Sequence, residues 1–439
     1  MENEDNSGSQ LAKHSIGFFL TRLLGTAVDT VVLWALGRYV FSHYTGQYII
    51  APVISFEAAT LVNFITSYRI VWKSRMKDAA KGELPRLFLA FNLSCVAGFI
   101  IKMIFLLLFE RAFGFDAYIC NLLALCVSGI FNFFISEKII FRKRYAEPKD
   151  AMLGLDEMCK ASPIFKGAWG RSLARLLMDL FGISRINRLY AGAADSRGIE
   201  ACSKVIDGMG CDYLVGNAAN LDLIPEEGAF VTVSNHPYGG LDGLIQIELV
   251  GSRRKDYKFI VNNILARAKS LGDAFITVTP TTTEKKAPDA VTVSGIKKIM
   301  LQLQEGHGLG CFPSGAVSDY IPKLRKLQDR KWQDSMLRII QKAKVPVIPI
   351  YFPDRNSRFF YFLGLISWKL RLLRLPSEYF NKHRSTHRVI VGLPISVEEQ
   401  QQYPDLAAYG KMLRDKVYNM PIPEEYTPRE RNQPPKTAL

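Results

Sequence analysis

The sequence is poor in cysteine and histidine, and the few that it has form no pattern of metal ligands or disulfides. Its seven cysteines include no Cys-x-x-Cys pair and no zinc-ligand spacing. Disulfide frameworks belong to oxidising compartments, so this usage favours a reducing one. His307, His383 and His387 are not accompanied by a convincing set of carboxylate or cysteine partners. We therefore expect no metal site and no bound cofactor.

Acidic residues are also in short supply. The chain has 41 Asp and Glu against 56 Lys and Arg, which gives a formal net charge of +15. This balance indicates an anionic partner, either a nucleic acid or the anionic face of a membrane. The sequence has no RNP-like, zinc-finger or helix-turn-helix signature, so we do not expect a nucleic-acid partner.

A cleavable signal peptide is not recognisable either, because the first apolar run is too long and lacks a small-residue cleavage pattern. Instead, the sequence contains four apolar segments, each close to the ~20 residues that cross a bilayer, at about 15–37, 48–70, 87–109 and 117–141. The second and fourth share a pattern that recurs 69 residues later, from Asn63 to Asn132. After a polar tail (1–14), residues 15–145 are predicted to form a four-helix, all-α transmembrane bundle of two repeated hairpins.

Basic residues indicate how this half is oriented. The loop after the second segment and the end of the fourth are rich in Lys and Arg, whereas the two hairpin loops hold little beyond Arg38 and Arg111. By the positive-inside rule, both termini and everything after residue 145 are cytoplasmic. We interpret the chain as an integral protein of a bacterial inner membrane.

Polar side chains inside the four segments are candidate functional residues. Charges in hydrocarbon cost several kcal/mol unless they pair or face a cavity. Arg22 and Asp29 are seven residues apart and share a helix face, so a purely structural ion pair remains an alternative. With the two repeated asparagines, the polar set is Arg22, Asp29, Glu57, Asn63, Lys102 and Asn132.

This half resembles the GtrA-like family of small four-span membrane proteins. The resemblance covers nearly all of residues 15–145 and rests on Leu24-Gly25 with Asp29, and on the two Asn-Phe repeats with their aromatic-basic ends. It implies a four-span fold and a role in moving polyprenyl-phosphate-linked sugars across membranes.

A linker (146–164) and an amphipathic segment follow. Within 165–190, the leucines Leu173, Leu176, Leu177 and Leu180 share a helix face, with Trp169 and several arginines between them. A basic amphipathic helix with a tryptophan is typical of the membrane interface. An ordinary surface helix that packs on a core is the alternative.

The second half is organised around one loop. A β-branched run ends at Ser234-Asn235, and the chain continues His236-Pro-Tyr-Gly239-Gly240-Leu-Asp242 before an apolar helix-like segment. Asp242 can hold the His236 ring while the free ring nitrogen takes a proton from a hydroxyl or amine. Apolar strands that alternate with helical segments from residue 200 onward predict an α/β domain.

The blocks of this half resemble the glycerolipid acyltransferase superfamily, which includes the lysophosphatidate acyltransferases. His236 and Asp242 match its His–Asp motif, 312–315 (Phe-Pro-Ser-Gly) its third block and 345–349 its last. The bacterial branch labelled hemolysin is the most similar. The resemblance implies a catalytic pair, His236 and Asp242. It also implies a set of substrate-binding residues: Asn235, Gly239, Gly240, Phe312, Pro313, Ser314, Gly315, Arg355 and Asn356.

Departures from the superfamily pattern bear on the acceptor. Five residues rather than four separate His236 from Asp242, and glycines at 239 and 240 can absorb the extra one. Val278, Ser314 and Val317 stand where the superfamily has Arg, Glu and Arg, the groups suited to a glycerol phosphate. An acyl-amino-acid lipid or another lysolipid is therefore at least as good a candidate for the acceptor as an acylglycerol phosphate.

The sequence thus predicts a multi-domain, membrane-bound acyltransferase, with its acyltransferase domain at 165–400 and a tail at 401–439. In this hypothesis His236 deprotonates a lipid acceptor, which attacks an acyl thioester of CoA or acyl carrier protein, while N–H groups near 239–243 or Gly315 stabilise the oxyanion. The alternative is a transporter of polyprenyl-phosphate-linked sugars with a non-catalytic, lipid-binding C-terminal half.

Overall fold

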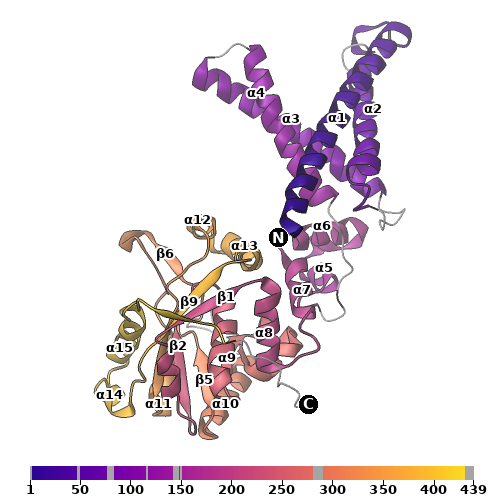
Figure 1. Ribbon diagram of the computed structural model, residues 1–439. Coiled ribbons are helices and arrows are strands. Elements are labelled where there is room, and N and C mark those ends of the chain that lie inside the picture. The colour runs from indigo at the N-terminus through magenta and orange to yellow at the C-terminus, as the bar shows by residue number, and fades with distance from the viewer. Residues whose placement is uncertain are drawn as a thin grey trace. The chain divides into compact units, whose positions relative to one another are not determined.

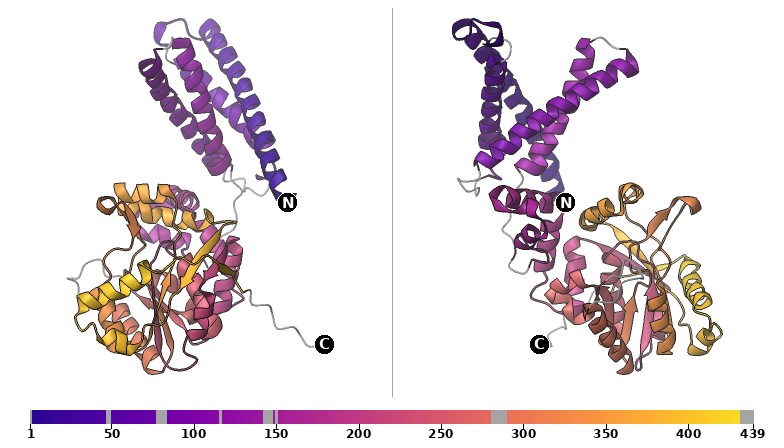
Figure 2. Two further views of the ribbon diagram at one scale, coloured as in Figure 1. Left: turned by 60° about the vertical axis from the view of Figure 1, so that its left-hand side comes forward. Right: turned by 180° about the vertical axis from the view of Figure 1, so that it is seen from behind.

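The computed structural model describes residues 2–46, 50–76, 84–114, 117–141, 148, 151–279 and 290–430. The chain divides into two compact units, Met1–Ala146 and Glu147–Leu439. Each unit is described by itself, and both are drawn in Figures 1 and 2.

The N-terminal unit is helical. Its helices are α1 (Glu2–Tyr39), α2 (Ala51–Thr66), α3 (Leu84–Phe113) and α4 (Ala117–Ile135). Among the described residues, two helical stretches are long and apolar enough to cross a membrane, Lys13–Tyr39 and Leu87–Phe113, and Leu122–Ile135 is a shorter apolar stretch. The apolar helical architecture is confirmed, whereas the count of four spans stays a prediction.

The polar tail predicted at 1–14 is helical from Glu2 onward, because α1 begins there. An apolar run shows only where a helix becomes compatible with hydrocarbon. Polar residues before it can continue the same helix in water, since water solvates their side chains.

The predicted repeat is visible at the ends of α2 and α4. Each continues into a single π-helical stretch, Ser67–Val71 and Ser136–Ile140. The residues that follow, Trp72 and Phe141, stack with ring centroids 4.4 Å apart and planes 9° apart. The two repeats therefore meet through equivalent aromatic residues.

The C-terminal unit is built on a mixed eight-stranded sheet of order β10-β1-β9-β8-β2-β5-β3-β4. The strands are β1 (Asp212–Gly216), β2 (Phe230–Ser234), β3 (Lys258–Asn262), β4 (Phe275–Val278), β5 (Gly308–Cys311), β8 (Val347–Tyr351), β9 (Thr386–Val391) and β10 (Tyr426–Pro428). From β8 to β4 all neighbours are parallel, and β9 joins β8 in the antiparallel sense. A separate ribbon pairs β6 (Asp319–Ile321) with β7 (Lys326–Gln328).

Helices cover both faces of this sheet, as Figures 1 and 2 show. One face packs on α8 (Gly198–Met209) and α9 (Leu241–Arg253). The other packs on α10 (Ala290–Gln304), α11 (Asp334–Ala343) and α15 (Leu406–Tyr418). Residues of β2 alternate between these two cores, with Phe230 in the first and Val231 and Val233 in the second, as a buried strand requires. The predicted α/β class is confirmed.

The predicted linker (146–164) and amphipathic segment (165–190) differ from their predictions. The stretch assigned to a linker contains α5 (Leu155–Ala161). The amphipathic segment is two helices, α6 (Gly167–Leu180) and α7 (Ile183–Ala191), because Gly182 between them has a φ of 83°. That left-handed conformation ends a helix, which leucine spacing alone does not reveal.

The remaining elements complete the unit. Helices α12 (Arg358–Ile366), α13 (Trp368–Phe380) and α14 (Val397–Gln401) lie around β8 and β9 in the chain. Short 3₁₀ turns occupy Pro163–Phe165, Ala218–Leu223, Asn263–Arg267, Lys269–Ala274 and Pro322–Leu324.

The predicted domain end at residue 400 is too early. On α15 the side chains of Tyr409, Leu413 and Val417 are fully buried, and β10 pairs with β1. The motif blocks that defined the domain in the sequence end before α15 and β10, so the motifs gave no sign that these two elements belong to the domain.

Candidate active site

Three adjacent parallel strands, β8, β2 and β5, end at the same edge of the sheet, where α/β proteins place their ligand sites. Asn235 and His236 follow β2, Phe312 follows β5, and Phe352 follows β8. Asn235 exchanges two hydrogen bonds with the backbone of Phe352, each 2.8 Å long. Its amide therefore joins two strand ends, and its predicted role in substrate binding stays a prediction.

His236 and Asp242 form the predicted pair. His236 Nδ1 lies 2.8 Å from Asp242 Oδ2, and the Asp242 side chain is completely buried. Asp242 also accepts backbone N–H groups, from Tyr238 at 2.9 Å and from Gly240 and Gly243 at 3.0 Å each. The loop wraps around the carboxylate, so the five-residue spacing brings the two side chains together.

The electrostatics of Asp242 favour an ionised carboxylate. Burial alone would raise its pKa, but the pKa is lowered overall by the nearby His236 and by the hydrogen bonds from His236, Tyr238 and Gly243. Its position in the first turn of α9 adds the positive end of a helix dipole. Since Asp242 engages Nδ1, Nε2 is the ring nitrogen left to exchange a proton with a substrate.

Phe312 lies flat against the His236 ring. The Phe312 and His236 centroids are 3.7 Å apart with planes at 20°, and Phe259 packs on Phe312 at 4.8 Å. This stacking fixes the imidazole plane. The residue predicted to bind substrate therefore also positions the His236 ring.

The rest of the Phe-Pro-Ser-Gly block is a structural turn. Pro313 accepts the Gln333 N–H at 2.8 Å through its carbonyl, and Ser314 Oγ donates to Ala316 O at 2.9 Å. Gly315, with a φ of 63°, donates its N–H to Phe312 O at 2.9 Å. The N–H groups of Gly315, Gly240 and Gly243 thus already donate to acceptors within the protein, and their predicted role as oxyanion donors stays a prediction.

Sequence reasoning missed Asp329. Its buried Oδ1 accepts the His236 N–H at 3.1 Å and the Ser318 hydroxyl at 2.6 Å, and Oδ2 accepts Trp332 Nε1 at 3.2 Å. Ser318 N–H in turn donates to His236 O at 2.8 Å. Burial raises the pKa of Asp329. Asp329 and Ser318 together hold the His236 backbone on both sides, and no motif in the sequence signals this.

Two further predicted residues, Asn356 and Arg355, differ in their burial. Asn356 is buried, donates from Nδ2 to Tyr238 O at 3.3 Å and accepts from Lys382 Nζ. It thereby supports the loop that carries His236. Arg355, its neighbour in the chain, is exposed.

The two glycines of the loop make close approaches possible. Gly239 has a φ of 84° and lies against Leu375 and Val317. A Cβ on Gly240 would lie 1.3 Å from Tyr379 Oη, whereas one on Gly243 would lie 3.6 Å from its nearest neighbour, Phe312. The loop therefore has space for a side chain at 243 but none at 240.

Gly240→Ala is expected to lower the free energy of unfolding by about 1–3 kcal/mol, because the new methyl displaces Tyr379 and with it α13. Thermal and urea unfolding of the full chain in detergent would measure this. Gly243→Ala is the matched control and should differ little from the parent. If both variants unfold alike, Tyr379 does not constrain the loop.

His387 makes the unit sensitive to acid. Its ring meets Tyr238 edge to face at 5.0 Å, and Nε2 lies 2.8 Å from Ser385 Oγ. Burial, helped by the nearby Lys382 charge, lowers the pKa of His387 from 6.5 to about 4. The unfolded chain therefore binds this proton at a higher pH than the native chain does.

Stability should consequently fall as the pH drops from 6.5 towards 4, by up to about 3 kcal/mol at the acid end. Unfolding of the parent and of His387→Gln, measured across this range, isolates the contribution, because other titrating groups act equally in both. Parallel pH curves for the two proteins would contradict this assignment.

The polar residues of the N-terminal unit have varied surroundings. Arg22 Nη1 lies 3.3 Å from Cys95 Sγ, Glu57 Oε2 accepts from Asn92 at 2.6 Å, and Lys102 lies 5.9 Å from the Phe99 ring centroid. Asp29 is half-buried. These contacts do not gather the predicted polar set at one point.

The two repeated asparagines occupy equivalent positions. A Cβ on Gly25 would lie 2.2 Å from Asn63 Nδ2, and one on Gly98 would lie 2.3 Å from Asn132 Nδ2. Each asparagine Oδ1 is buried without a hydrogen-bond partner. The repeat is thus preserved in three dimensions down to an Asn–Gly contact.

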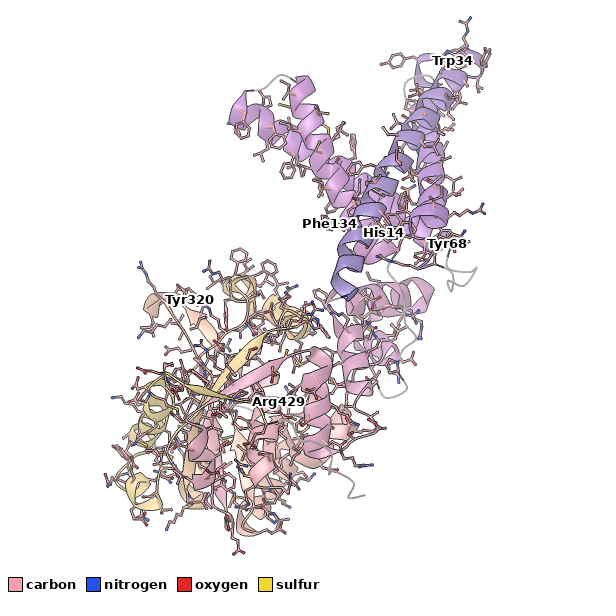
Figure 3. The ribbon with its side chains drawn as sticks, viewed as in Figure 1. His14, Trp34, Tyr68, Phe134, Tyr320 and Arg429 are labelled. Carbon is pink, nitrogen blue, oxygen red and sulfur yellow. The ribbon has the colours of Figure 1, made fainter. Side chains whose placement is uncertain are left out.

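Glu137 was also missed. It accepts from Trp72 Nε1 at 2.6 Å and pairs with Arg75 at 2.5 Å and His14 at 3.0 Å; His14 is labelled in Figure 3. It lies just before Phe141, in the aromatic-basic end of the second repeat.

Across the ranges that the structure describes, His, Cys, Asp and Glu side chains form no group of three that could hold a metal ion.

Comparison with known proteins agrees with this division of the chain. Residues 17–141 match the family model described as the GtrA/DPMS transmembrane domain, and residues 167–422 match the model described as acyltransferase. Both resemblances drawn from the sequence are confirmed.

Two curated relatives are both named lyso-glycine lipid O-acyltransferase. The one from Bacteroides thetaiotaomicron is 27% identical over 230 residues, 51% of this chain and 79% of the relative. The one from Phocaeicola vulgatus is 24% identical over 229 residues, 51% of this chain and 77% of the relative.

Proposed function

Because this chain belongs to the acyltransferase family whose model its residues 167–422 match, we propose that it transfers a fatty acyl group from a thioester to the hydroxyl of a lysolipid. Its nature as a lipid acyltransferase rests on the family and on the two relatives. The acceptor, the donor and the roles of individual residues are our proposal.

The observation that carries it is the His236–Asp242 pair at the carboxyl edge of the sheet, with Phe312 stacked on the imidazole. His236 Nε2 takes the proton of the acceptor hydroxyl as its oxygen attacks the thioester carbonyl. The carbon–sulfur bond then breaks, and the departing thiolate takes the same proton from the imidazolium. The buried carboxylate of Asp242 stabilises that imidazolium between the two transfers.

Nearby nucleophiles support direct transfer rather than an acyl-enzyme. Cys311 precedes Phe312, but it is 1% exposed, and burial raises the pKa of its thiol to about 12. A thiol in that state is inert. The hydroxyls of Ser314 and Ser318 already donate to Ala316 O and Asp329.

For the acceptor, we propose an acyl-amino-acid lipid of the lyso-glycine type with a free hydroxyl. Two arginines of the C-terminal unit, on α13 and β9, are already paired: Arg371 with Asp319, and Arg388 with Asp354 at 2.5 Å. A phosphomonoester acceptor needs guanidinium or N–H groups that are still available. The names of both relatives support the same class.

We place the reaction at the cytoplasmic leaflet of the inner membrane. The N-terminal unit would span the bilayer with four helices and keep both termini in the cytoplasm, in accordance with its basic loops. Acceptor and product both reside in that leaflet. The donor would be acyl-CoA or acyl carrier protein.

The test is an acyl-transfer assay with the purified full chain in vesicles and isotopically labelled acyl-CoA or acyl carrier protein. Lyso-glycine lipid and lysophosphatidate are offered in parallel. We expect label in the former, lost in His236→Ala. Label only in phosphatidate would overturn the acceptor, and no label in either would overturn the reaction.

A second candidate function concerns the N-terminal unit alone. Its family match and the duplicated Asn–Gly contact support binding of a polyprenyl-phosphate-linked sugar. A cellular phenotype that Asp29→Ala ends and His236→Ala leaves intact would favour this transporter role over acyl transfer.

A further inference from the structure

Helices α12 and α13 form an apolar hairpin whose outer side is uncovered. Six of its large apolar side chains are between 44% and 60% exposed: Phe359, Phe362, Leu365, Ile366, Trp368 and Leu372. Monomeric soluble proteins rarely expose contiguous apolar surface on this scale unless something binds there. The two helices pack against each other, so these side chains lie on one hairpin.

The inner side of the same hairpin is firmly anchored. Phe360 is fully buried, and Glu378 is 1% exposed. Glu378 accepts from the Ser357 N–H at 3.0 Å and the Ser357 hydroxyl at 2.8 Å. The exposed apolar side is therefore held in place by the fold.

Basic residues border the exposed side. Arg355, Arg358 and Lys369 are all exposed, and the Arg374 guanidinium lies 5.5 Å from the Phe359 ring centroid. Phenylalanine, leucine and tryptophan framed by Lys and Arg suit the boundary between anionic headgroups and acyl chains. A protein partner would not account for the cationic border as simply.

The hairpin is also joined to the catalytic loop. Arg371 Nη1 donates to Ser318 O at 3.2 Å, and the Ser318 N–H donates to His236 O at 2.8 Å. Leu375 lies against Gly239 and Tyr379 against Gly240. In Figure 1 the β6 ribbon stands beside α12, and Tyr320 of that ribbon, labelled in Figure 3, packs on the buried cluster of Val317, Phe360 and Tyr361.

We propose that the α12–α13 hairpin inserts into the headgroup boundary of an anionic lipid bilayer and brings the His236 loop to the membrane surface. Insertion stands independently of the reaction. The consequence that the hairpin admits a bilayer-embedded acceptor to His236 rests on the proposed function.

Insertion is tested with the full chain reconstituted in vesicles of phosphatidylcholine and phosphatidylglycerol. In a Cys126→Ser, Cys159→Ser background, Phe362→Cys carries an environment-sensitive fluorophore. Lys342→Cys is the control, since it is exposed on α11, just before the amino end of β8 and hence at the opposite edge of the sheet. Lipids with nitroxide on the acyl chain should quench the probe at 362 several-fold more than the probe at 342.

Equal quenching at the two positions would overturn insertion. So would a probe at 362 that is shielded from aqueous iodide but not quenched by the nitroxide lipid, because protein would then cover the hairpin. A probe at 362 quenched as strongly in vesicles of phosphatidylcholine alone would overturn the role of the basic border.

Acceptor entry is tested with the double variant Phe362→Ser, Leu365→Ser. Its KM for a long-chain acceptor in vesicles should rise roughly tenfold, with kcat for a short-chain acceptor in detergent unchanged. Leu393→Ser removes one exposed leucine beyond β9 and is the control. An unchanged KM would overturn acceptor entry while the quenching result still decides insertion. If the parent chain transfers no acyl group to any acceptor, the proposed function fails, and the quenching alone decides the hairpin.

Discussion

His236→Ala is expected to lower kcat for acyl transfer by about 100- to 10,000-fold, the contribution typical of a general base. The variant keeps Asp242 buried among backbone N–H groups from Tyr238, Gly240 and Gly243. The carboxylate therefore stays solvated by the loop, and the fold should survive. Acyl incorporation into lipid is the measurement, with thermal unfolding in the same detergent to establish that the variant is folded.

Two controls separate proton transfer from simple loss of a side chain. Added imidazole should restore part of the activity of His236→Ala, because the cavity left beside Phe312 has the shape of the missing ring. Phe312→Leu keeps the base but removes the flat surface that orients it, so its loss should be much smaller. An active, folded His236→Ala would contradict the proposed mechanism.

Asp242→Asn is expected to reduce kcat for a different reason. An amide cannot stabilise the imidazolium, and its NH₂ group must point at one of the N–H donors that the carboxylate now accepts. The loop should loosen as well as lose charge. Activity and unfolding temperature should therefore both fall, whereas in His236→Ala activity falls almost alone.

How much of this site the sequence could predict depended on distance along the chain. His236, Asp242 and the two glycines lie within seven consecutive residues, so a local motif could bring them together in the prediction, and the resemblance to a known family implied a base and its carboxylate. Asp329 is 93 residues from the backbone N–H that it accepts, and Phe352 is 117 residues from the Asn235 amide. Their partnership arises only when parallel strands bring their ends together, and no local pattern records it.

The same limit applies to residues of the motif blocks that also have structural roles. Asn235 and Ser314 lie in motif blocks, and a motif does not distinguish a side chain that meets substrate from one that holds the turn. In the structure both make hydrogen bonds to the backbone of the protein itself. Membership of a motif thus indicated that these residues lie near the site, and their contact with substrate stays a prediction.

Arg429 shows the limit at the end of the chain, where sequence analysis placed a tail. Its Nε and Nη2 atoms donate to Glu248 at 2.8 and 2.5 Å, and Nη1 pairs with Asp207 at 2.7 Å. The side chains of Arg429 and Glu248 are only 2% and 5% exposed. Figure 3 labels Arg429 in the C-terminal unit. Although burial alone would lower it, the pKa of Arg429 is raised by the hydrogen bonds and charge of these carboxylates.

Arg429→Ala is therefore expected to destabilise the C-terminal unit by about 3–5 kcal/mol, because it leaves the buried Glu248 carboxylate unpaired. Glu248 lies on α9, the helix that begins at the Asp242 loop, so the variant should also lose activity when warmed. Urea unfolding of the full chain in detergent measures the difference in free energy.

Arg253 provides the matched control for this prediction. It belongs to the same helix and pairs with Glu430 at 3.7 Å, but its side chain is 38% exposed. Such surface pairs contribute only about 0–1 kcal/mol, so Arg253→Ala should unfold almost as the parent does. Adding Glu248→Gln to Arg429→Ala should recover part of the loss, since the buried group is then neutral. Equal unfolding of Arg429→Ala and Arg253→Ala would mean that water reaches Glu248, and the chain after α15 would then not stabilise the catalytic helix.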